Sequence, residues 1–116
     1  MSTIPEEKRK SIRVPVDLEA HLRKDNRDYV ARILNLSTEG VFVKTTHLLD
    51  ANDQVDIFFH LPGLKHRIHA AAAVRWGGPM EGGAVRGAYG LGISFQELAA
   101  DQKEEIETYI QNLLQA

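Results

Sequence analysis

The residues best suited to bind an anion are two arginines near the amino terminus. Arg9 and Arg13 are four residues apart, and Lys8 precedes them. A guanidinium is a planar fork of donors that matches phosphate oxygens, or the O6/N7 edge of guanine, in bidentate fashion. Pro15 favours extended geometry before it, and an even separation in an extended chain puts both side chains on one side. The spacing suggests a clamp for a small anionic ligand, although such a basic run is also typical of a solvated tail.

A second polar motif contains Asn35, Ser37 and Gly40. Asn35 and Ser37 are two residues apart, so on an extended chain they face one way while Leu36 faces the core. Asparagine offers a donor and an acceptor, serine offers a hydroxyl, and glycine permits a positive φ or a close ligand approach. The motif therefore suits a base edge or a phosphate. The same pattern also forms Asx or ST turns that simply reverse the chain, so both interpretations stay open.

The other reactive side chains form no recognisable catalytic or metal-binding pattern. The chain has five histidines and no cysteine, which excludes disulfides, thiolate metal sites and cysteine nucleophiles. His66 and His69 are three residues apart, so a strand would put them on opposite faces. No serine lies in a G-x-S-x-G motif, and no nucleophile has a visible base. We therefore expect no enzyme, no metal site and no cofactor.

The composition indicates a single globular domain. The chain has 116 residues, of which 43% are hydrophobic and 26% charged, so it can bury a core without disulfides. The net charge of −2 and the aromatic content of 7% argue against DNA or RNA binding, so any anion affinity must be local. No window approaches the roughly 20 apolar residues that span a bilayer, and no signal peptide is visible. We expect a cytoplasmic protein without membrane insertion.

Alternating apolar residues predict a series of short strands over most of the chain. Residues 1–8 lack periodicity and are expected to form a flexible tail, whereas residues 9–116 are expected to form one domain. A polar hairpin turn is expected over residues 23–28, after the first strand. The predicted strands cover residues 14–22, 29–36, 41–46, 54–61, 65–76 and 89–95.

The last third of the chain decides the fold class. The alanine-rich stretch 65–76 has helical propensity, but turn residues on both sides favour a strand. Residues 77–87 are rich in glycine and predict a flexible loop. An apolar stripe at helical spacing predicts an amphipathic helix over about 101–115, capped by Asp101; the stripe contains Ile106, Tyr109, Ile110, Leu113 and Leu114. We therefore predict a mainly β fold, a small six-stranded antiparallel barrel with a C-terminal helix.

The two polar motifs and the strand pattern together resemble the PilZ domain, a bacterial receptor module for cyclic di-GMP. Arg9-x-x-x-Arg13 lies just before the first predicted strand, and Asn35-x-Ser37-x-x-Gly40 follows the second. The resemblance extends to Val74-Arg75-Trp76, to residues 89–95 and to the closing helix, and it covers residues 8–114. It implies a barrel of the same kind.

The resemblance also implies roles for the motif residues. Arg9 and Arg13 match the family arginines that grip guanine edges and phosphates. Asn35 matches the acidic or amide residue that reads a guanine. Ser37 would lie beside it on a phosphate or base, and Gly40 would allow a close backbone approach. Because asparagine lacks the charge of aspartate, the resemblance implies a lower affinity for the guanine N1/N2 edge.

Two further residues and a function complete this interpretation. The cation Lys8 is expected to favour two stacked ligand molecules over one. Trp76 is expected either to stack on a guanine or to close one end of the barrel as a core residue. We expect a receptor that orders its N-terminal arm on binding cyclic di-GMP and then changes its contacts with an unidentified downstream protein. The alternative is a PilZ-like protein–protein interaction module that binds no nucleotide.

Overall fold

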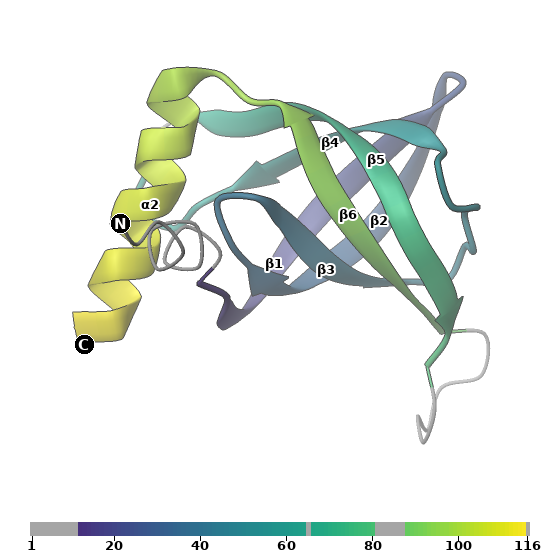
Figure 1. The fold of residues 1–116 in the computed structure, drawn as a ribbon, viewed down its shortest axis with the longest axis horizontal. Coiled ribbons are helices and arrows are strands. Elements are labelled where there is room, and N and C mark those ends of the chain that lie inside the picture. Colours follow the sequence, from purple (N-terminus) through teal and green to yellow (C-terminus); the bar gives the residue numbers. More distant parts are fainter. Residues whose placement is uncertain (1–11, 65, 81–87, 116) are drawn as a thin grey trace, which may run out of the picture.

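The computed structural model describes residues 12–64, 66–80 and 88–115, which form a six-stranded β-barrel with one helix (Figure 1). The predicted fold class is therefore confirmed. The tail predicted for residues 1–8 lies outside the described residues, as do Lys8 and Arg9. The elements are β1 (Val14–Lys24), β2 (Arg27–Leu36), β3 (Gly40–Thr45), β4 (Gln54–His60), β5 (Arg67–Pro79), β6 (Tyr89–Glu97) and α2 (Ala100–Gln115).

All neighbouring strands pair in antiparallel fashion, and the sheet closes on itself. The strand order is β1-β2-β3-β6-β5-β4, and β4 returns to pair with β1 from Ala20↔Phe59 to Arg23↔Asp56. Closure removes the unpaired edges of an open sheet. It also brings β1, which follows the basic run, into the same surface as β5 and β6 from the second half of the chain.

Alternation along the strands separates a packed interior from the outer surface. In β4, for example, Val55, Ile57 and Phe59 are buried. The alanine-rich stretch is a strand, as predicted, because Ala70 and Ala72 face the interior and leave room for larger side chains from other strands. The barrel is thus a filled core rather than a channel.

Strand β1 ends later and β2 begins earlier than predicted. The turn predicted over residues 23–28 contains only Asp25 and Asn26, with φ values of 52° and 65°. Positive φ at both central residues is the geometry of a type I′ hairpin, in which the flanking residues continue the ladder. Accordingly, Arg23 pairs with Asp28 and Lys24 with Arg27.

The glycine-rich loop is also shorter than predicted. Gly77, Gly78 and Pro79 belong to β5 and pair with Leu91, Gly90 and Tyr89 of β6. Local propensity disfavours glycine and proline in strands, but pairing with a neighbouring strand supplies hydrogen bonds that the sequence pattern alone does not reveal. Residues 81–87 lie outside the described residues, so the rest of the loop prediction stays a prediction.

Helix α2 covers one end of the barrel (Figure 1) and is anchored by the first half of its apolar stripe. Ile106 and Ile110 are buried in the core cluster, and Tyr109 packs against it. Leu113 and Leu114 are exposed, so the second half of the predicted stripe does not reach the barrel. The helix begins at Ala100, and Asp101 accepts a hydrogen bond from the adjacent Gln102 amide instead of standing before the first turn as a cap.

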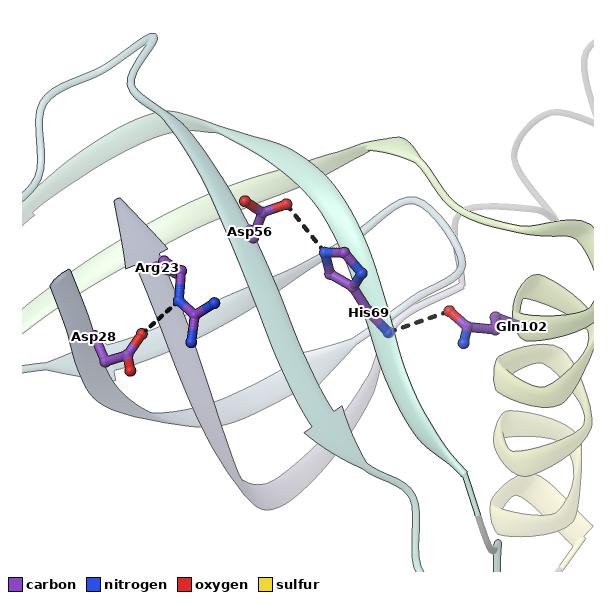
Figure 2. A network of polar contacts seen from close by, with 5 residues as sticks. All are labelled: Arg23, Asp28, Asp56, His69 and Gln102. Carbon is purple, nitrogen blue, oxygen red and sulfur yellow. Dashed lines mark hydrogen bonds and ion pairs between the residues drawn. The ribbon is translucent and has the colours of Figure 1, made fainter. Parts of the chain in front are cut away.

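The side chain of Gln102 connects α2 to residues of β5 that have no pairing partner in β6 (Figure 2). Its Oε1 accepts from the His69 amide at 3.1 Å, and its Nε2 donates to the Arg67 carbonyl at 3.3 Å. At the start of β5, the side-chain amide therefore takes the hydrogen-bonding position that a neighbouring strand would occupy. His69 also contacts Asp56 at 3.0 Å, and Phe58 stacks on its ring.

A second polar contact lies at the hairpin of β1 and β2 (Figure 2). Arg23 donates to Asp28 at 2.9 Å across the strand pair. This hydrogen bond and the charge of Arg23 lower the pKa of the Asp28 carboxyl from its ordinary value. The ion pair is exposed, so it adds little stability.

Because the helix is anchored by few side chains, we predict that Ile106→Ala lowers the free energy of unfolding by about 2–5 kcal/mol. Ile106 is fully buried at 0% exposure, and the substitution would leave a cavity beneath α2. The measurement is urea denaturation followed by circular dichroism.

The matched control is Leu114→Ala on the same helix, where the side chain is 58% exposed. We expect a change within about 0.5 kcal/mol. Equal losses in the two variants would contradict the anchoring role of Ile106.

Candidate functional site

Four paired residues form a row across the outer face of the barrel. Asn35 of β2 pairs with Phe42 of β3, Phe42 pairs with Gly92 of β6, and Gly92 pairs with Trp76 of β5. Directly paired residues share a face of the sheet. With strands about 4.8 Å apart, Asn35 and Trp76 are separated by about 14 Å along the sheet.

Gly92 leaves the space in which the aromatic side chains of this row meet. A Cβ at Gly92 would collide with the indole of Trp76, and a Cβ at Gly90 would come within 2.8 Å of the Phe42 ring. The rings of Phe42 and Trp76 stack across this strand with centroids 5.5 Å apart and planes at 27°. We call these two side chains the aromatic pair.

Trp76 is 54% exposed, so the alternative that it is a core residue is wrong. The indole instead lies on the outer face, with Gly92 beneath it. An exposed flat ring of this kind is suited to stacking on a base.

The turn between β2 and β3 is built around the hydroxyl of Ser37. The amides of Glu39 and Gly40 donate to Ser37 Oγ at 3.0 and 3.2 Å, and the Ser37 amide donates to the Gly40 carbonyl at 3.0 Å. Ser37 is 2% exposed, and it lies beyond the end of β2. Ser37 therefore forms the turn that was one of its two interpretations. The expectation that Ser37 faces the same way as Asn35 along a strand is wrong.

Gly40 serves the packing of β3 against β6. A Cβ at this position would collide with the carbonyl oxygen of Ile93. The motif predicted that Gly40 allows a ligand to approach closely, but here it is strand β6 that approaches the backbone of Gly40. The turn is fixed further by the Phe95 amide, which donates to the Glu39 carbonyl at 2.9 Å.

A hollow of about 160 Å³ lies between the start of β1, this turn, β5 and β6. Its charged lining residues are Arg13, Glu39 and Arg75. Within the described part of the chain, neither arginine forms an ion pair, whereas Arg23 and Arg32 lie 2.9 and 2.7 Å from carboxylate oxygens. The complete lining comprises Arg13, Glu39, Gly40, Val41, Arg75, Trp76, Gly92, Ile93 and Ser94.

Arg75 is the residue that sequence reasoning missed. In a regular strand, Arg75 and Trp76 would point to opposite faces. The register shifts between Val74 and Trp76, however, so β5 carries one extra residue there. Val74 is buried while Arg75 and Trp76 are both exposed, as expected for a bulge that re-aims a side chain. The sequence signal was the tripeptide itself, but the bulge depends on pairing with β6.

Some of the predicted site residues line the hollow, and others lie elsewhere. Arg13, Gly40 and Trp76 all line it. Asn35 lies on the same outer face, three strands away from Trp76, and its side chain forms no hydrogen bond with another described residue. Ser37 supports the turn from within. Lys8 and Arg9 lie outside the described residues, so their roles stay predictions.

A larger hollow of about 410 Å³ lies between α2 and residues 62–64, but its charged lining residues are Glu104 and Glu105. Two carboxylates disfavour an anionic ligand. Over residues 12–64, 66–80 and 88–115, no group of three or more His, Cys, Asp or Glu side chains is arranged to hold a metal ion. The described helix is neither long nor apolar enough to cross a bilayer.

Comparison with known proteins identifies one family and two similar structures. The family model described as the PilZ domain matches residues 7–112. No curated protein matches the sequence significantly. Bacillus subtilis inhibitor of motility (MotI/DgrA) superposes with a TM-score of 0.73 at 16% identity, covering 91% of this chain and 51% of its own.

The second structure is MrkH, a c-di-GMP-dependent transcription regulatory factor. It superposes with a TM-score of 0.75 at 18% identity, covering 90% of this chain and 50% of its own. At these identities the likeness concerns the fold alone. The present chain spans about half the length of each of these proteins.

We predict that Gly92→Ala displaces the indole from Phe42 and lowers the free energy of unfolding by about 1–3 kcal/mol, because the added methyl group collides with Trp76. Trp76 is the single tryptophan of the chain, so its fluorescence emission reports the displacement directly.

Gly78→Ala is the matched control on β5. A Cβ there meets no atom within 4 Å, and its φ is not positive. We expect unchanged emission and a stability change of no more than about 1 kcal/mol. An emission spectrum of Gly92→Ala identical to that of the wild type would contradict the packing of the aromatic pair.

Ser37→Ala tests the role of the hydroxyl without any ligand. Removing Oγ leaves the amides of Glu39 and Gly40 without this acceptor, so we predict a loss of about 1–3 kcal/mol in the free energy of unfolding. Ser94→Ala is the control, because the Ser94 side chain forms no hydrogen bond within the described residues. Denaturation curves that coincide for both variants would rule out the turn role.

Proposed function

Because this chain belongs to the PilZ domain family, we propose that it is a receptor for cyclic di-GMP that works without catalysis. In this proposal, ligand binding changes the contacts of the protein with a downstream partner. The protein would act in the cytoplasm, where it would bind a free dinucleotide rather than DNA or RNA. The family match and the fold support a binding module of this kind.

The observation that carries the proposal is the joint lining of one hollow by Arg13 and Trp76. Cyclic di-GMP combines phosphates with flat guanine bases. Arg13 forms no ion pair with the residues that the structure describes, so its guanidinium can donate to phosphate oxygens, and the exposed indole offers a surface for a base.

The extent of the site also suits a ligand with two bases. The hollow of about 160 Å³ is smaller than the roughly 300–1,000 Å³ of pockets that enclose a whole drug-sized ligand. The rest of the ligand would then extend along the row from Trp76 towards Asn35, over the Phe42 ring. Asn35 has no other described hydrogen-bond partner for its side-chain amide, so it remains available to read a guanine edge.

The proposal assigns the switch to the N-terminal arm. Arg13 lies at the junction of the arm and β1, directly before Val14. Arg9 would complete the clamp from the other side of the ligand, and Lys8 would favour a second stacked ligand molecule. Ordering of the arm on binding would create a new surface for an unidentified protein. The two similar structures are about twice as long as this chain, so their own partners and outputs are not carried over.

We predict that the wild-type protein binds cyclic di-GMP with a dissociation constant on the order of micromolar or better. Arg13→Ala should weaken binding by at least about 100-fold, because it removes charge-assisted hydrogen bonds to the ligand. The measurement is calorimetric titration, and its stoichiometry distinguishes one ligand molecule from two.

Arg27→Ala is the matched control, since Arg27 is exposed and lies at the opposite end of the β1–β2 hairpin. It should bind as the wild type does, and an added single-stranded polynucleotide should not compete. Absence of binding by the wild type would rule out the receptor and favour the alternative, a protein–protein interaction module that binds no nucleotide.

A further inference from the structure

The bulge in β5 gives the candidate site a second arginine within the barrel itself. Arg75 is the extra residue between Val74, which faces the core, and Trp76, which faces outward. Without the bulge, one of the two neighbours would have to point into the barrel. The shift in register therefore lets a cation and an aromatic ring stand side by side on one surface.

The surroundings of Arg75 leave its guanidinium uncompensated. Three charged residues line the hollow, namely Arg13, Arg75 and Glu39, so the lining carries a net positive charge. Arg75 forms no ion pair within the described part of the chain, not even with Glu39. Elsewhere on the barrel, Asp28 and Asp17 hold the guanidiniums of Arg23 and Arg32. Arg75 is therefore free to bind an anion.

The neighbours of Arg75 indicate which part of a nucleotide it binds. A base stacked on Trp76 needs partners for its edge, and Glu39, which lines the same hollow, offers the acceptors that guanine N–H groups require. Arg75 offers donors alone, which match the oxygens of a phosphate. In a nucleotide, the phosphate is linked to the base through the sugar, so a cation adjacent to the stacking ring is suitably positioned for it.

We propose that Arg75 is a further ligand-binding residue of this site and that its guanidinium binds a phosphate of the ligand beside a base stacked on Trp76. This inference rests on the proposed function. Arg13 and Arg75 then hold the ligand from two elements, the start of β1 and the bulge of β5. The barrel supplies one of these cations at a fixed position, independently of the arm.

The test is titration of cyclic di-GMP into the full 116-residue chain, followed by calorimetry and by the fluorescence of the single tryptophan. We expect Arg75→Ala to weaken binding by about 10- to 100-fold, the effect of losing a hydrogen bond to a charged group. Arg75→Lys should recover most of the affinity, because a lysine still binds phosphate as a point charge. Arg27→Ala serves as the control for the loss of an exposed arginine.

Salt dependence distinguishes a phosphate contact from a contact to a neutral base. The difference between wild type and Arg75→Ala should shrink at high ionic strength, because salt screens the attraction between exposed charges. An unchanged difference at low and high salt would overturn the phosphate assignment.

The remaining outcomes separate this inference from the function on which it rests. If the wild type binds and Arg75→Ala binds equally well, the role of Arg75 is overturned while the receptor function stands. If the wild type does not bind, both are overturned. Thermal unfolding of each variant verifies folding, and an exposed position predicts changes within about 0.5 kcal/mol.

Discussion

The candidate site depends on space that glycine leaves where β6 meets its two neighbours. On one side, the absence of a side chain at Gly40 allows β3 to lie against the Ile93 carbonyl. On the other, Gly92 accommodates the indole of Trp76, which stacks on Phe42 from the far strand. A methyl group at Gly40 would collide with a backbone oxygen, and one at Gly92 would collide with the Trp76 indole. The aromatic pair and the hollow beside it follow from this close packing.

Shifts in register change which side chains of a strand face outward near the candidate site. With strict alternation, every second residue of a strand would face the core. Shifts occur between Pro15 and Leu18 in β1, between Ile33 and Asn35 in β2, and between Val74 and Trp76 in β5. Each strand thus keeps its buried residues while the side chains near the site are re-aimed. The bulge in β5 adds a cation, Arg75, to the surface beside Trp76.

Positive charge is distributed unevenly over a chain with a net charge of −2. Three of the six described arginines have a local partner: carboxylates hold Arg23 and Arg32, and Arg67 lies over the Phe58 ring. Such partners reduce the field that a distant anion experiences. Within the described residues, no carboxylate pairs with Arg13 or Arg75 at one hollow, whereas the hollow between α2 and residues 62–64 is lined by glutamates. The distribution of partners, rather than the total charge, distinguishes the two hollows.

The sequence by itself determined the six strands, the closing helix and the family, because alternation and helical spacing are local patterns that survive in any context. It also identified Arg13, Gly40 and Trp76, which line one hollow. Only the tertiary structure decided that Gly77–Pro79 is strand, that Ser37 supports a turn from within, and that Arg75 shares a face with Trp76. The limits of β5 and the bulge at Arg75 depend on the register between β5 and β6, which no pattern within either strand fixes. The Ser37 turn depends on hydrogen bonds that the residue types alone left open.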